Sequence, residues 1–102
     1  HFEAARAFGE RILSEGGSTA DERITFAYRA TLSRSPKPEE LTVVRRALEQ
    51  YIERYQTDPA AAKQVVSVGE SKRKTNRPDT ELAAYTLIAN LILNLDETVM
   101  RN

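Results

Sequence analysis

The sequence predicts an all-α fold, a compact bundle of four to five helices around a central apolar helix near the C-terminus. The central helix is predicted from residues 82–95, which include no charged side chain although 29% of the chain is charged. Such a segment is typical of a helix that its neighbours cover on most sides. Elsewhere apolar residues recur at the helical period, and no strand-like alternation is visible. The 102 residues suffice for a single domain with one core.

The first two helices are predicted with clear boundaries. A loose apolar stripe indicates a helix over residues 2–14, which the glycine pair 16–17 ends. The second helix is expected over residues 21–34. Thr19 and Glu22 fit a capping box, in which the hydroxyl and the carboxylate each accept a hydrogen bond from a free backbone N–H.

The remaining helices have start signals of their own. Pro38 suits the first position of a third helix, expected over residues 38–56 with one apolar face. Asp58, followed by a proline, indicates a short fourth helix that ends near residue 68. Residues 69–78 are polar and are predicted to form an exposed loop, after which the central helix begins.

The charge balance and the absence of cysteine exclude several classes of protein. Lysine plus arginine total 15, as do aspartate plus glutamate, so the zero net charge argues against nucleic acid as a partner. Without cysteine the chain has neither disulfides nor a C-x-x-C-H attachment site for c-type haem. The apolar run is also too short for a membrane span, which needs about 20 apolar residues.

A polar stripe on the central helix is the first candidate site. Thr86, Asn90 and Asn94 lie four residues apart and therefore share one side of that helix. Buried amides must be hydrogen-bonded, because an unpaired one costs about 1–3 kcal/mol. Two interpretations are open. The side chains either bond neighbouring backbone and fix how the helices pack, or face another part of a longer parent polypeptide.

The acidic pair Asp96-Glu97 ends the apolar run and is the second candidate. Its oxygens suit a hard cation, but no D-x-D-x-D-G pattern accompanies them, so acids in a surface turn are the preferred interpretation. Residues 72–77 are basic, yet without an aromatic residue for base stacking they are interpreted as a solvated loop. His1 is the only histidine, which leaves no nucleophile–histidine pair. The sequence therefore indicates no catalytic residue, no metal ligand and no cofactor in this chain.

Three groups of short motifs, in a fixed order, carry a resemblance to a known family. They are residues 22–24 and 32–36 followed by 38–41, the Val-Gly-Glu-Ser run at 68–71, and residues 82–85 with 93–97. Together they resemble the C-terminal region of the planctomycete secreted-domain family of unknown function, the 1553 family. The chain departs from that family at Thr98, where phenylalanine is usual.

The resemblance implies a context rather than a chemistry. In that family the region ends large exported proteins, which often carry c-type cytochrome domains upstream. The resemblance therefore implies an exported parent, periplasmic or at the cell surface, and no catalytic residue can be transferred from it. The chain opens with His1 and not with Met, which agrees with the expectation of a C-terminal piece of a longer protein.

Arg34 is the third candidate, at the expected C-terminus of the second helix. A positive charge there interacts favourably with the helix dipole, and a guanidinium can pair with a carboxylate of Asp96 or Glu97. We expect this pair to join the second and last helices across the bundle.

These patterns predict a non-catalytic structural or interaction module that docks to upstream domains of its parent. They do not indicate an oligomeric state. The alternative is enzymatic, with the chain contributing a wall or one acid, Asp96 or Glu97, to the shared active site of a hydrolase or oxidoreductase. An inward-facing carboxylate in a cleft favours that alternative, whereas exposed and scattered acids favour the docking module.

Overall fold

The computed structural model describes residues 2–67 and 77–101, and the side chains of residues 3–67 and 77–96. Within these ranges the chain forms five α-helices and no strand, which confirms the predicted all-α bundle. The helices are α1 (Phe2–Glu15), α2 (Ala20–Leu32), α3 (Pro38–Thr57), α4 (Pro59–Val66) and α5 (Asp79–Arg101). The Val-Gly-Glu-Ser run and most of the basic loop lie outside the described residues.

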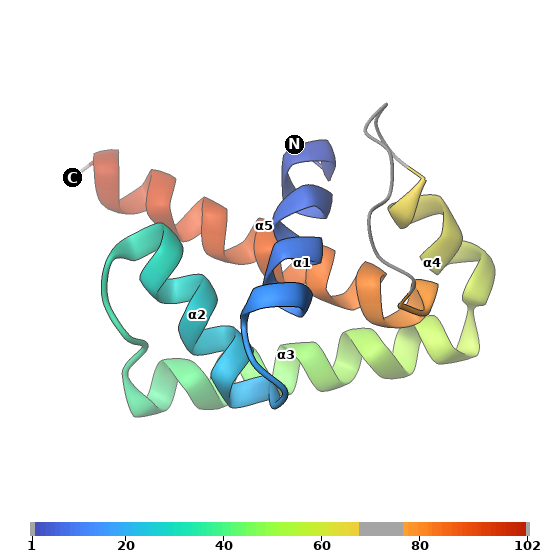
Figure 1. The fold of residues 1–102 in the computed structure, drawn as a ribbon, viewed down its shortest axis with the longest axis horizontal. Coiled ribbons are helices and arrows are strands. Elements are labelled where there is room, and N and C mark those ends of the chain that lie inside the picture. The colour runs from blue at the N-terminus through green and yellow to red at the C-terminus, as the bar shows by residue number, and fades with distance from the viewer. Residues whose placement is uncertain (1, 68–76, 102) are drawn as a thin grey trace.

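Helix α5 is the centre of the bundle, as its charge-free sequence predicts. The other four helices all contact it, and α1 does so most extensively (Figure 1). Helix α1 crosses α5 steeply, whereas α3 runs beside α5 in roughly the opposite direction. The buried residues of α5 are Leu82, Ala83, Ala84, Tyr85, Thr86, Ile88, Ala89 and Ile92.

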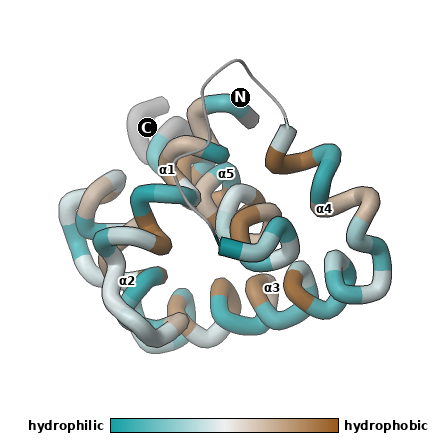
Figure 2. Tube along the Cα trace, turned by 45° about the vertical axis from the view of Figure 1, so that its right-hand side comes forward, coloured by the Kyte–Doolittle hydropathy of each residue, from teal (hydrophilic) through white to brown (hydrophobic). Residues whose placement is uncertain are grey.

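The amphipathic helices turn their apolar faces to α5. Figure 2 shows hydrophobic and hydrophilic residues alternating turn by turn along α3. Val44, Leu48 and Tyr55 of α3 are buried, while the exposed positions between them carry most of its charges. Tyr28 and Tyr85 are likewise buried. Burial raises the pKa values of Tyr28 and Tyr55 above the ordinary value of a phenol.

A glycine lets α1 and α5 approach each other closely. Gly9 is buried, and a Cβ atom on it would lie 3.1 Å from the backbone nitrogen of Thr86 and 3.2 Å from its Cα. Those atoms belong to helix backbone and cannot rotate away. The flanking Ala5 and Ile12 are fully buried on the same side of α1. Any larger side chain at position 9 therefore pushes the two helices apart.

The helix starts follow the predicted caps. The Thr19 hydroxyl accepts the N–H of Glu22, and the Glu22 carboxylate accepts the N–H of Thr19, which completes the capping box. Pro38 occupies the first turn of α3. The Asp58 carboxylate accepts the N–H of Ala61 at the start of α4.

Arg77, which lies just before α5, stabilises the C-terminal end of α1. Its guanidinium donates to the backbone oxygen of Leu13 at 3.2 Å and pairs with Glu81 at 2.7 Å. The last turn of α1 contains no basic residue of its own. Arg77 therefore brings a positive charge to the negative end of the α1 dipole.

Two helices end at other residues than predicted, α2 earlier and α5 later. Helix α2 ends at Leu32 and not at residue 34, since Ser33 adopts the left-handed conformation with φ 60°. Arg34 therefore lies in the connector. Helix α5 continues through Asp96-Glu97 to Arg101, because no glycine or proline follows residue 95 to stop it. The predicted acidic surface turn is instead part of α5.

The close approach of α1 and α5 at Gly9 predicts that a larger side chain there strongly destabilises the fold. Gly9→Val should lower the free energy of unfolding by about 2 kcal/mol or more, because its side chain overlaps the α5 backbone. Ala7→Val is the matched control, since Ala7 is exposed on the same helix and should lose only about 0.5 kcal/mol of helix propensity. Urea unfolding followed by circular dichroism measures both. Equal stabilities for the two variants would contradict the close packing of α1 on α5.

Candidate functional site

The polar stripe predicted on α5 divides into a buried and an exposed part. Thr86 is fully buried, and its hydroxyl donates to the backbone oxygen of Leu82 at 2.7 Å. Asn90, one turn further, is half-buried, and Asn94 is exposed. Thr86 is thus satisfied within its own helix, whereas the two asparagines reach the surface.

Two leucines lie beside these asparagines on the same side of α5. Leu87, Asn90, Leu91 and Asn94 are spaced at i, i+3, i+4 and i+7, so they share one face of the helix. Both leucines are half-buried, packed against the core with part of each side chain at the surface. We call these four residues the α5 outer face. It carries aliphatic and amide groups but no charge.

Arg34 pairs with Glu40, a carboxylate other than the two expected for it. Its guanidinium donates two parallel hydrogen bonds to Glu40, Nη1 to Oε1 at 2.8 Å and Nη2 to Oε2 at 3.0 Å. It also lies over the ring of Tyr28, with Cζ 5.4 Å from the ring centroid. The expected partners were Asp96 and Glu97. Asp96 is half-buried on α5, and the side chain of Glu97 lies outside the described residues.

The Arg34–Glu40 pair joins α2 to α3 across the short connector. The Glu40 carboxylate also accepts the backbone N–H of Lys37 at 2.8 Å, so it caps α3 while it binds Arg34. Hydrogen bonds from Arg34 and from Lys37 lower the pKa of Glu40 from 4.5 to about 2. The pair stabilises how the helices meet, and it forms no cleft.

A buried ion pair on α1 was not predicted. Arg6 is 1% exposed and Glu10 is 8% exposed, and Arg6 Nη1 lies 2.6 Å from Glu10 Oε1. The spacing of four residues signals an ion pair on one helix, but charged residues at this spacing are usually exposed. In the described part of the chain, every fully buried side-chain nitrogen or oxygen has a hydrogen-bond partner. The pair is therefore a satisfied element of the core.

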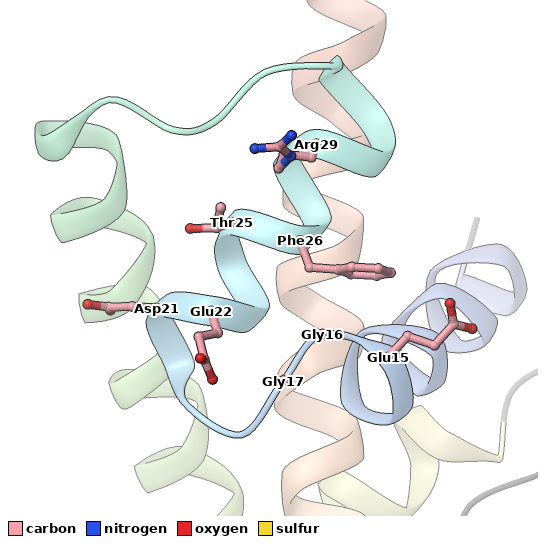
Figure 3. A pocket seen from close by; sticks show the side chains of 8 residues that line it. All are labelled: Glu15, Gly16, Gly17, Asp21, Glu22, Thr25, Phe26 and Arg29. Atoms are coloured by element: carbon pink, nitrogen blue, oxygen red, sulfur yellow. The ribbon is translucent and has the colours of Figure 1, made fainter.

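A hollow of about 550 Å³ opens between the end of α1 and the start of α2 (Figure 3). Figure 3 shows Asp21 and Phe26 pointing to opposite sides of α2, so the side chains do not converge on one point. The residues around the hollow are Glu15, Gly16, Gly17, Asp21, Glu22, Thr25, Phe26 and Arg29.

The acids around this hollow are engaged in the structure of the domain. Glu22 accepts the backbone N–H groups of Ser18 and Thr19, which lower the pKa of its carboxyl. Asp21 accepts a hydrogen bond of 2.8 Å from Arg45 of α3. Asp21 and Glu22 are therefore occupied by contacts within the domain.

The described residues contain no group of three or more histidine, cysteine, aspartate or glutamate side chains placed to hold a metal ion. Among the same residues, no helix combines the length and the apolar character that a membrane crossing requires. Comparison of the chain with protein-family models, with curated proteins and with solved structures gave no match.

The lowered pKa of Glu40 predicts an acid-sensitive contribution to stability. Because this carboxyl has a pKa of about 2 in the folded chain and 4.5 as its ordinary value, the Arg34 contact stabilises the fold above about pH 4.5. That contribution is lost as the pH falls toward 2. Glu40→Gln should therefore lower the Tm by about 4 °C at pH 7 and by progressively less below pH 4.5.

Thermal melts of both proteins between pH 2 and pH 7 measure this difference. Glu39→Gln is the matched control, because Glu39 is an exposed neighbour at the start of the same helix. Its Tm should differ little from that of the parent chain at any pH. A Glu40→Gln difference that stays constant down to pH 2 would show that the carboxylate does not stabilise the α2–α3 connection.

The buried pair on α1 predicts non-additive mutations. Arg6→Met should destabilise the chain by about 3 kcal/mol or more, because it leaves the Glu10 carboxylate buried without the guanidinium. Arg6→Met combined with Glu10→Leu should be more stable than Arg6→Met alone, because neither charge then remains in the core. Denaturant unfolding of the single and double variants measures this coupling.

An exposed pair with the same spacing supplies the control for this experiment. Arg11 Nε lies 3.4 Å from Glu15 Oε1, and both side chains are more than half exposed. Arg11→Met should therefore change the stability by less than about 1 kcal/mol. If Arg6→Met were as mild as Arg11→Met, the Arg6–Glu10 pair would not belong to the core.

Proposed function

We propose that this chain is a non-catalytic structural or interaction module that docks within a larger exported protein linked to c-type cytochrome domains. The observation that carries the proposal is that an uncharged side of α5 reaches the surface. Residues 82–95 have the charge-free composition of a helix that its neighbours cover on most sides. Yet the α5 outer face reaches the surface, with Asn90 half-buried and Asn94 exposed.

The surface of α3 shows what a solvent-facing helix looks like in this protein. Five of its ten exposed positions carry charged side chains, namely Glu39, Arg46, Glu49, Glu53 and Arg54, while another carries Val43, which is 64% exposed. Long charged side chains keep a helix surface hydrated and oppose non-specific association. The α5 outer face lacks them and presents leucines and amides instead. Such a surface suits contact with another protein surface better than contact with bulk water.

The identity of the partner is proposed from the family resemblance. The motifs at residues 32–36 and 93–97 resemble a region that follows other domains in large exported proteins. Upstream domains of the same polypeptide are therefore the proposed partner. In this arrangement the chain fixes the position of its neighbours and supplies no chemistry of its own.

Three carboxylates, those of Glu10, Glu22 and Glu40, favour the docking module over a share in an active site. A catalytic acid is typically held with a raised pKa in a cleft. Glu22 and Glu40 instead have lowered pKa values, because each accepts backbone N–H groups at a helix start. The inward-facing Glu10 is paired with Arg6. Each of these acids has a structural task, which supports the non-catalytic proposal.

Binding to the upstream polypeptide tests the proposal. Purified chain and the polypeptide encoded directly upstream of it should elute together in size-exclusion chromatography. Calorimetry should give a Kd of about 10 µM or lower, as expected for a specific contact. A helical domain of similar size and zero net charge, from an unrelated exported protein, is the control. Failure to bind at about 500 µM would refute the docking function.

A further inference from the structure

The connector between α2 and α3, residues 33–37, is the longest run outside a helix in residues 2–67 and 77–101. Ser33, Arg34 and Ser35 are exposed, as is Lys37. Exposed loops of small and polar residues are the preferred sites of proteolysis, because a protease binds its substrate as an extended strand and a helix must first unwind. The connector is therefore the part of the described chain that a protease can bind with the least loss of helical structure.

One bond in this connector has the chemistry that trypsin-class proteases require. These enzymes cut after lysine or arginine but not where proline follows, because the proline ring at the nitrogen of the bond obstructs their active site. Outside the helices, the described residues include three basic side chains, Arg34, Lys37 and Arg77. Both Lys37 and Arg77 precede a proline. The Arg34–Ser35 bond is thus the one that remains for such an enzyme.

The side chain that the protease must bind is held by the fold. A trypsin-class enzyme places the residue before the cleaved bond in a deep pocket, where a carboxylate pairs with its charge. The Arg34 guanidinium already pairs with both oxygens of Glu40 and lies over the ring of Tyr28. It also donates to the backbone oxygen of Ser35 at 3.2 Å, an atom of the residue that follows the bond. Arg34 cannot enter the protease pocket until these contacts break.

We propose that the Arg34–Ser35 bond is a cleavage site for an arginine-specific serine protease, and that Glu40 controls access to it. Cleavage adds water across the peptide bond, which gives Arg34 a free carboxylate and Ser35 a free amine. The cut divides the chain into a piece with α1 and α2 and a piece with α3, α4 and α5. The proposal is separate from the docking function, since it involves neither α5 nor a partner domain.

Limited digestion with trypsin tests the proposal. The parent chain and Glu40→Gln are digested side by side, and mass spectrometry follows the new chain ends at Arg34 and Ser35. Glu40→Gln should be cut at this bond about fivefold faster, because a neutral amide binds the guanidinium more weakly than a carboxylate does. Cleavage after the other lysines and arginines, recorded in the same digests, measures the general destabilisation of each protein.

Three results would overturn the proposal. Equal rates of cleavage at the Arg34–Ser35 bond in the two proteins would show that Glu40 does not control access. An equal acceleration at every cleaved bond would show that Glu40→Gln merely destabilises the whole fold. If Glu40→Gln were cut elsewhere but never after Arg34, the connector would be no protease site.

Asp21→Asn is the matched control for the loss of an ion pair alone. Asp21 accepts a hydrogen bond of 2.8 Å from Arg45, so this variant also removes an exposed pair between α2 and α3 but leaves Arg34 bound to Glu40. Its cleavage at the Arg34–Ser35 bond should be as slow as in the parent chain. Circular dichroism at the digestion temperature confirms that both variants are folded. If Asp21→Asn accelerated this cut as much as Glu40→Gln, the specific role of Glu40 would be refuted.

Discussion

The contact between α1 and α5 is the constraint on which the rest of the structure depends. Gly9 allows the backbones of the two helices to meet, and the buried Ala5, Ile12 and Leu13 pack beside that point. With α1 in place across α5, the other helices cover the remaining sides of α5 and complete a single core. A chain of about 100 residues can form only a small core, so its hydrophobic stabilisation comes mostly from the contacts of α5 with the helices around it.

Short-range electrostatics supports this core at the points where helices begin and end. The Glu22 and Glu40 carboxylates each satisfy free N–H groups at a helix start. Arg77 satisfies a carbonyl at the end of α1, and Arg34 holds the connector between α2 and α3. These contacts are partly exposed, so they define helix boundaries and entry angles more than they add to total stability. The same acids are thereby occupied in the structure, which is why the surface offers so little prepared chemistry.

The fold class and the helix starts were predictable because local chemistry determines them. Thr19 with Glu22, Pro38 and Asp58 are start signals whose partners lie within three residues, and the charge-free run of α5 identified the central helix. The end of α2 was not predictable, since serine rarely adopts the left-handed conformation seen at Ser33.

The side-chain pairs depend on geometry that the sequence does not express. Glu40 meets Arg34 only because the connector folds back, and the depth of the Arg6–Glu10 pair depends on how α1 lies on α5. The asparagines of the candidate face could be assigned to one side of the helix by spacing. Which of them are covered is decided by the neighbouring helices.

The pairing of the first and last of the five helices has a consequence for the synthesis of the chain. Residues of α1 leave the ribosome before α5 has been made, so the helix that α1 contacts most extensively is absent during most of translation. The core can therefore close only once nearly all of the domain has emerged. Until then the chain exposes the apolar face of α1, a period in which chaperones have access to an unfolded polypeptide.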